Sequence, residues 1–144
     1  MNDPLKVILD TAVLVAAFRS RIGASNAVLR LALQGAFKMG GTITLFLEYT
    51  EVLHRPEQLA AHGISPSEIT RTLGLLAAIA EPIPLYFRWR PQLRDPNDEM
   101  VLDAAINGRV DAIVTHNVRD FLPEASRFNI RVLTPAQFLS EVKR

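Results

Sequence analysis

The sequence has no cysteine, no long apolar run and almost no excess of charge of either sign. Without cysteine the chain forms no disulfide, binds no metal through thiolates and has no cysteine nucleophile, so its chemistry rests on oxygen and nitrogen. Because 16 Lys and Arg face 15 Asp and Glu, a polyanion would need a local basic patch. No stretch approaches the roughly 18 apolar residues of a membrane span, and no signal-peptide pattern opens the chain. We therefore expect a cytoplasmic protein without membrane association.

Two common binding motifs are also missing. Gly40 and Gly41 form an isolated pair rather than a glycine-rich phosphate loop, and the three histidines are too scattered for a zinc-site spacing. There is no internal repeat or linker. A chain of 144 residues that is 49% hydrophobic suits one compact domain, which we expect to span residues 1–144.

Secondary structure is predicted from hydrophobic period and capping residues. Short apolar runs predict strands at 6–10, 37–40, 83–85, 111–115 and 129–133. Helical spacing predicts helices at 12–18, 25–36, 42–53, 65–80, 95–108 and from 134 onward, with Pro56 closing the third. This alternation indicates an α/β fold, in three layers with a central, mainly parallel sheet between helices.

In such a sheet, ligands bind beyond the carboxyl ends of the strands. Asp10 ends the first predicted strand, and the segment 115–120 follows the fourth. An aspartate before a helix is also a common cap, and this remains the alternative interpretation of Asp10. That edge of the sheet is where we expect the functional site.

A carboxylate on an apolar helix face is a second signal, because burying an unpaired charge is costly. In the helix after Asp95, Asp98 falls on the same stripe as Val101 and Leu102, whereas Asp95 is explained as the cap. We expect Glu99, Asp103 and Asn107 on the opposite, solvated side. The alternative for Asp98 is an ordinary first-turn acid, favoured by about 0.3–1 kcal/mol.

The helix over 42–53 carries two further acids, one turn apart. Glu48 borders the apolar face beside Leu45 and Val52, and Glu51 projects further round, so Glu48 is the better candidate. An ordinary flanking charge explains Glu48 equally well. Carboxylates from three segments would repel one another in a shared cleft unless a cation balanced them, and oxygen ligands favour Mg²⁺ or Mn²⁺.

Several segments together resemble the PIN-domain family. They are Val-Ile-Leu-Asp-Thr at 7–11, Leu-Phe-Leu-Glu-Tyr-Thr-Glu-Val-Leu-His-Arg-Pro at 45–56, Arg-Asp-Pro-Asn-Asp-Glu at 94–99, Val-Thr-His-Asn-Val-Arg-Asp-Phe at 114–121 and Val-Leu-Thr-Pro-Ala-Gln-Phe-Leu at 132–139. The resemblance extends over nearly the whole chain and is strongest to the PIN-domain toxins of prokaryotic toxin-antitoxin pairs. It implies a parallel sheet between helices and an endoribonuclease that depends on Mg²⁺ or Mn²⁺.

The resemblance also assigns roles to residues. Asp10, Asp98 and Glu48 would hold the metal, and Thr115 and Asn117 would orient ligand or water. Two positions depart from the family: Ala12 replaces a usual Asn or Ser, and Asn117 replaces a frequent Asp. Each departure leaves room for a weaker or degenerate site. The implied partners are an RNA substrate, an antitoxin protein and a second copy of the chain in a homodimer or larger assembly.

Two basic segments are candidates for contact with single-stranded or loop RNA. They contribute Arg19 and Arg21, and Arg88, Trp89 and Arg90. The alternative is solvated arginines with Trp89 packed on the domain or in a dimer interface. The rival function is a catalytically weak module that acts by binding an antitoxin or itself. An exonuclease acting on structured DNA ends would need a larger surface than this chain provides.

Overall fold

The computed structural model describes residues 5–86 and 95–142. Within them, five parallel strands form one sheet in the order β3-β2-β1-β4-β5. The strands are β1 (Lys6–Leu9), β2 (Lys38–Gly41), β3 (Glu81–Pro82), β4 (Ala112–Val114) and β5 (Arg131–Leu133). The predicted α/β fold with a parallel sheet is confirmed, although β3 lies just before the predicted range.

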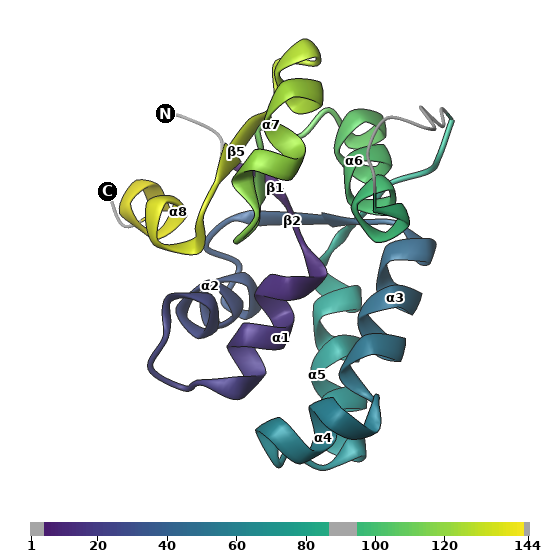
Figure 1. Cartoon of the computed structure of the whole chain (residues 1–144), viewed down its shortest axis with the longest axis vertical. Coiled ribbons are helices and arrows are strands. Elements are labelled where there is room, and N and C mark those ends of the chain that lie inside the picture. Colours follow the sequence, from purple (N-terminus) through teal and green to yellow (C-terminus); the bar gives the residue numbers. More distant parts are fainter. Residues whose placement is uncertain (1–4, 87–94, 143–144) are drawn as a thin grey trace.

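Helices cover both faces of this sheet. They are α1 (Thr11–Arg19), α2 (Ala24–Leu33), α3 (Ile43–Leu53), α4 (Pro56–His62), α5 (Pro66–Ile79), α6 (Pro96–Gly108), α7 (Val118–Arg127) and α8 (Pro135–Val142). Figure 1 shows α1 to α5 on one side of the sheet and α6 and α7 on the other, with α8 beside α2. The fold is therefore the expected three-layer arrangement.

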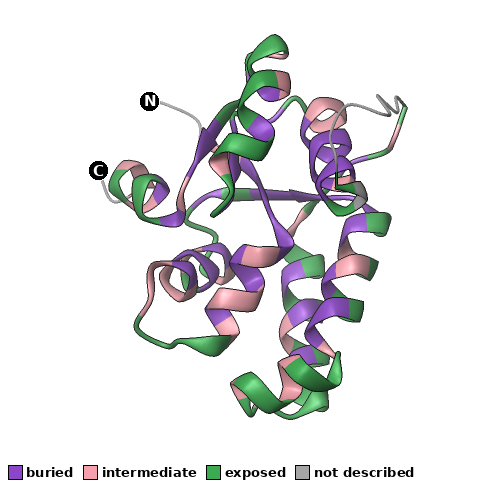
Figure 2. Ribbon diagram, viewed as in Figure 1, coloured by how far each residue is buried: buried purple, intermediate pink, exposed green. Residues whose placement is uncertain are grey.

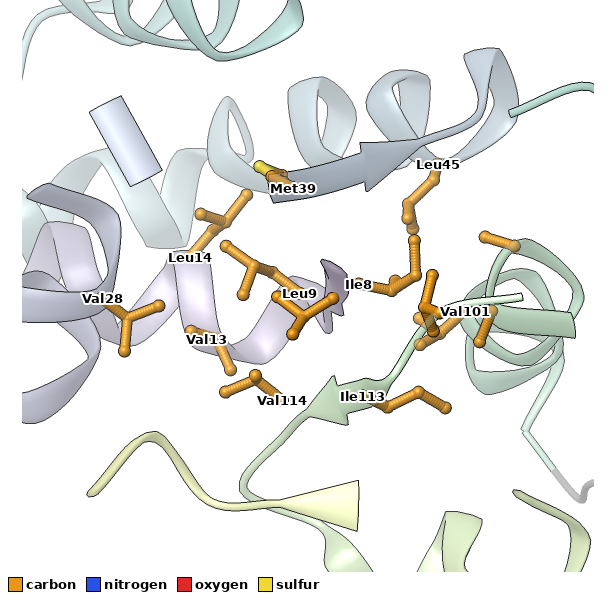
Figure 3. Packing of buried hydrophobic residues seen from close by; sticks show 14 of the residues in the cluster. Ile8, Leu9, Val13, Leu14, Val28, Met39, Leu45, Val101, Ile113 and Val114 are labelled. Atoms are coloured by element: carbon orange, nitrogen blue, oxygen red, sulfur yellow. The ribbon is translucent and has the colours of Figure 1, made fainter. Parts of the chain in front are cut away.

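The core is built around β1, whose side chains are buried on both faces of the sheet. Figure 2 colours this strand as buried along most of its length. Ile8 points toward Val101 of α6, whereas Leu9 points toward Val13 of α1 (Figure 3). Successive strand residues face opposite sides, so one apolar run packs against both helical layers and fixes where Asp10, the residue that follows β1, emerges.

The strand order places a topological switch beside β1. The chain runs outward from β1 to β2 and β3, and then returns to β4 and β5 on the other side of β1. In sheets of this kind a crevice forms at the carboxyl ends of the two strands where the order reverses. Here those ends carry Asp10 after β1 and Thr115 after β4.

The paired glycines of β2 are needed for packing. A Cβ on Gly41 would lie 2.3 Å from Cε2 of Phe46, and a Cβ on Gly40 would lie 2.6 Å from Cδ1 of Ile83. Neither glycine has a positive φ. Their role is close approach of neighbouring side chains to the strand, not a turn or a phosphate loop.

Three features of the helices differ from the expectations. The helix α3 ends at Leu53 as expected, but Pro56 also opens α4, a helix that was not predicted, as its first residue, a position that suits proline. The helix α7 was not predicted, although Phe121 and Ala125 form its buried stripe. Glu99 and Asp103 are buried, with 4% and 1% exposure, because α6 packs against β1, β2, β4, α3 and α7 rather than facing solvent on one side.

Among the described residues, no single helix is long and apolar enough to cross a membrane. Helices α1 and α2 pass such a test only as a pair, by length and composition, and they are bent by 104° at the break between them.

Candidate metal site

Asp10 occupies the N-cap position of α1, but its side chain makes no capping hydrogen bond. Instead, the hydroxyl of Thr115 donates to Oδ2 of Asp10 at 2.7 Å, and the backbone N–H of Asp10 donates to the Val114 carbonyl at 3.0 Å. Both side chains are buried. The backbone N–H groups of Thr11 and Ala12 also act to lower the pKa of Asp10, so its carboxylate interacts with the start of α1 and is held in addition by the neighbouring strand end.

Tyr49 supports the same strand end from the other side. Its ring is fully buried, and its hydroxyl donates a hydrogen bond to the carbonyl of Leu9. The sequence had placed Tyr49 only on the apolar face of α3. A tyrosine on a buried stripe usually finds a partner for its hydroxyl, and that is the signal that would have indicated a positioning role.

Asp98 lies in the first turn of α6 with 9% of its surface exposed. The cap of this helix is Asp95, whose side chain accepts from the backbone N–H of Asn97 at 2.9 Å, as expected. No cation pairs with Asp98 within the described residues. Asp98 therefore has an inward placement that capping does not explain.

Glu48 and Glu51 differ as the helical period of α3 predicts. Glu51 is exposed and pairs with Arg55, with Oε2 of Glu51 2.9 Å from Nη2 of Arg55. Glu48 is half-buried, and its Oε1 is a buried acceptor with no hydrogen-bond partner. A buried oxygen of this kind is a natural ligand or water-binding group.

These side chains meet in one open pocket of about 350 Å³. Its wall includes five of the predicted site residues, namely Asp10, Glu48, Asp98, Asn117 and, at the end of α1, Arg19. Thr115 lies behind Asp10 and does not reach the wall, and Arg21 is exposed elsewhere on the surface. Arg88, Trp89 and Arg90 lie outside the described residues.

Further residues line the pocket that the sequence had not singled out as part of it. Arg55, Asp95 and Asn97 contribute to its wall beside Ala12. Arg55 stands in the segment 45–56 that resembles the PIN-domain family, but the resemblance assigns it no role.

The pKa values of three carboxyl groups at the pocket are raised, because burial disfavours their charged forms. Burial, reinforced by the charges of Asp10, Asp95, Asp120 and Glu99, raises the pKa of Asp98 to about 6. Burial also raises the pKa of Asp10, although the Thr115 hydroxyl offsets part of this shift. The pKa of Glu48 is raised by burial and by Glu51, with Arg55 acting in the opposite direction.

Asn117 lies at the N-cap of α7, but its side chain makes no capping hydrogen bond. Its backbone N–H donates to Oγ1 of Thr115 at 3.0 Å, which links it to Asp10 through one hydroxyl. The exposed amide of Asn117 is therefore free of a capping role and faces the pocket.

The donor set fits a hard divalent cation. It consists of carboxylate oxygens and an amide, and Glu48 adds a buried oxygen that lacks a partner. In the described parts of the chain, no three His, Asp or Glu groups are close enough to bind a metal ion as they stand. Mg²⁺ is commonly held by one or two carboxylates with several waters, so the fit does not require three converging side chains.

A larger hollow of about 730 Å³ lies at the opposite edge of the sheet, lined by Arg109, Asp111, Arg131 and mainly apolar neighbours. Asp111 accepts there from the backbone N–H of Lys6 at 2.9 Å, and Arg131 pairs with Glu141. Asp111 and Arg131 thus already have partners, and the smaller pocket remains the better candidate.

Comparisons with known proteins agree with the fold. The chain is similar to a chain in the crystal structure of VapBC2 from Rickettsia felis bound to a DNA fragment from their promoter. The TM-score is 0.58 at 14% identity, covering 90% of this chain and 98% of that one. No curated protein matches. The family model of the PIN domain matches residues 6–119, and the chain belongs to the PIN-domain family, whose members generally are nucleases that use divalent metal ions.

Proposed function

We propose that this chain is an endoribonuclease that hydrolyses phosphodiester bonds of single-stranded or loop RNA with the help of Mg²⁺ or Mn²⁺. The observation that carries the proposal is the convergence of Asp10, Glu48 and Asp98, from three separate elements, on one pocket at the switch point of the sheet. Burial, and after it the repulsion from neighbouring acids, raises the pKa of Asp98 to about 6. Such repulsion is costly in a structural site but useful where a cation binds.

In this proposal Asp10 and Asp98 hold the metal, and Glu48 holds a second ion or orients the attacking water through its unpartnered Oε1. A bound divalent ion lowers the pKa of water and neutralises charge on the phosphodiester. The Thr115 hydroxyl fixes the orientation of the Asp10 carboxylate. Asn117 offers an amide at the pocket wall, which orients water or phosphate without adding charge.

Substrate contact is proposed for Arg19 and Arg21 and for Arg88, Trp89 and Arg90. Arginines suit phosphate pairing, and an aromatic ring between them suits stacking of an unpaired base. Arg19 lies at the pocket wall, which supports its part of the proposal. The other residues stay predictions, as do a single domain over 1–144 and a cytoplasmic location.

We further propose that the chain is the toxin of a toxin-antitoxin pair, with an antitoxin protein and a second copy of itself as partners. The similar chain from Rickettsia felis comes from a complex named VapBC2 that binds a fragment of its own promoter. Large apolar side chains are exposed on the adjacent helices α3 and α5, namely Ile43, Leu47, Leu75 and Ile79. Exposed apolar groups of this kind are typical of protein interfaces.

The second candidate function is a catalytically weak module that acts by association. It is favoured by Ala12 and Asn117 and by the lack of three closely grouped acids in the described residues. On that alternative, metal would add little to the free energy of unfolding.

Cleavage of a pool of single-stranded RNA distinguishes the two. We expect cleavage with Mn²⁺ or Mg²⁺, none with EDTA, and a loss of at least a hundredfold in Asp10→Asn. Glu68→Gln serves as the control, because Glu68 is exposed in the first turn of α5 and lies outside the pocket. Metal-independent melting together with no cleavage would favour the binding module instead.

A further inference from the structure

Two arginines from distant parts of the chain share the wall of the carboxylate pocket. Arg19 is the last residue of α1, and Arg55 is the residue before α4. Both line the pocket that contains Asp10, Glu48 and Asp98. The wall of this one pocket therefore combines acidic side chains with two arginines, whose elements are joined by the packing of α1 against α4.

Arg19 is tied to the turn that begins at Arg55. Its Nε and Nη2 donate to Oε1 of Gln58 at 3.2 and 3.0 Å. The backbone N–H of Gln58 donates to the Arg55 carbonyl at 2.9 Å. Because the side chain that holds Arg19 is a neutral amide, and no carboxylate in residues 5–86 and 95–142 pairs with Arg19, its positive charge is uncompensated.

Arg55 is oriented by an acid of the preceding helix. Its Nε and Nη2 donate to Glu51, at distances of 2.9 to 3.2 Å. The charge of Arg55 also reaches Glu48, where it opposes the rise in pKa caused by burial. For both arginines, no described residue accepts a hydrogen bond from Nη1. Each guanidinium is thus held through Nε and Nη2, and the N–H groups of Nη1 are left to donate to a ligand.

We propose that Arg19 and Arg55 form a subsite for a backbone phosphate next to the scissile one. This inference rests on the proposed function and names the part of the substrate that this wall binds. A strand whose scissile phosphate lies at the carboxylates carries its next phosphate a short distance away. That phosphate would be repelled by Asp95 and Glu48, whereas two held guanidinium forks match its oxygens.

Because Gln58 is uncharged, it holds the Arg19 side chain without cancelling its positive charge. An acid at position 58 would hold Arg19 in a similar place but would cancel its charge. We therefore expect Gln58→Glu to weaken phosphate binding as removal of Arg19 does, whereas a purely structural role for this contact predicts no loss.

The test uses the full chain carrying Asp98→Asn, so that cleavage does not interfere, in EDTA. The probe is a 5′-fluorescein-labelled uridine octaribonucleotide, and its dissociation constant is measured by fluorescence anisotropy over a series of KCl concentrations. Arg19→Gln, Arg55→Gln and Gln58→Glu are added one at a time, and melting curves confirm that each variant is folded. Arg71→Gln is the control, since Arg71 is exposed on α5 and lies outside the pocket.

Each lost phosphate contact is expected to reduce the slope of log affinity against log salt by about 0.7, the value for single strands. We expect this reduction in all three test variants and not in the control. An unchanged slope in both arginine variants would overturn the subsite, as would failure of the octamer to bind the parent. Cleavage by the wild type with Mn²⁺ decides separately whether the proposed function survives either result.

Discussion

Asp98→Asn is expected to make the metal-free protein more stable while it abolishes metal-dependent cleavage. The pKa of Asp98 is about 6 in the folded protein against a model-peptide value of 3.8, because burial and neighbouring acids disfavour its charged form. An acid whose folded pKa is raised destabilises the fold when it ionises. The loss of stability sets in as the pH rises through the unfolded pKa and is complete above the folded one.

A shift of about two pKa units corresponds to an upper limit of about 3 kcal/mol at neutral pH. Because Asp98 borders an open pocket, solvent screens part of this repulsion, and we expect about 1–2 kcal/mol. For a chain of this length that is roughly 3–8 °C in melting temperature. The gain should be present at pH 7.5, should shrink as the pH falls below about 6, and should vanish only below 3.8, where the carboxyl group is protonated in both states.

The assay is thermal unfolding in EDTA at pH 4.5, 6 and 7.5, followed by the same scans with Mn²⁺. We expect Mn²⁺ to stabilise the wild type and to have little effect on Asp98→Asn. Glu68→Gln removes another first-turn acid, one that is exposed, and should cost only about 0.3–1 kcal/mol. Asp103, which the helical period placed on a solvated face, is buried and is no suitable control. Equal melting of Asp98→Asn and wild type at every pH would refute the reasoning.

Three further substitutions test the neighbours of the site. Thr115→Val removes the hydrogen bond to Asp10, so the acid limb of kcat/KM against pH should move up by about one unit, and an unmoved limb would exclude this role. Tyr49→Phe removes the bond to the Leu9 carbonyl and should lower the free energy of unfolding in urea by about 1–2 kcal/mol; an unchanged midpoint would contradict it. Asn117→Asp adds a charge at the pocket and should tighten Mn²⁺ about tenfold by calorimetry, whereas equal affinity would place this residue beyond the metal's reach.

Local rules predicted those parts of the fold that depend on local contacts. Ser65 caps α5 through the backbone N–H of Glu68, and Thr134 and Gln137 bond reciprocally at the start of α8, as their spacing indicated. The alternation of strands and helices likewise indicated the parallel sheet, and hence the edge at which Asp10 emerges. These features can be predicted without knowing which residues far apart in the sequence are in contact.

The failures come from tertiary context. The helical period assumes one buried face, but α6 is enclosed by strands on one side and by helices on others, so Glu99 and Asp103 are buried as well. No helix was predicted after β4, yet α7 forms with Pro123 inside it, because Phe121 and Ala125 pack into the core. The local sequence of a helix does not show whether other elements pack against it on several sides.

The residues of the site also divide into those that local sequence rules identify and those that depend on tertiary packing. Asp98 was identifiable because it stands on an apolar helix stripe, and Asp10 because it follows a buried strand at the edge of the sheet where ligands bind. Arg55 was not, because its place on the pocket wall depends on how the turn into α4 lies against α1.

The most direct test of the metal site is a crystal of the chain soaked in Mn²⁺ and measured for anomalous scattering. We expect a peak in the pocket, with carboxylate oxygens of Asp10 or Asp98 at about 2.0–2.3 Å and Glu48 bound directly or through water. We also expect Glu51 to stay paired with Arg55 and to make no contact with the ion. No peak there at saturating Mn²⁺, or a peak only elsewhere on the surface, would show that this pocket is not a metal site.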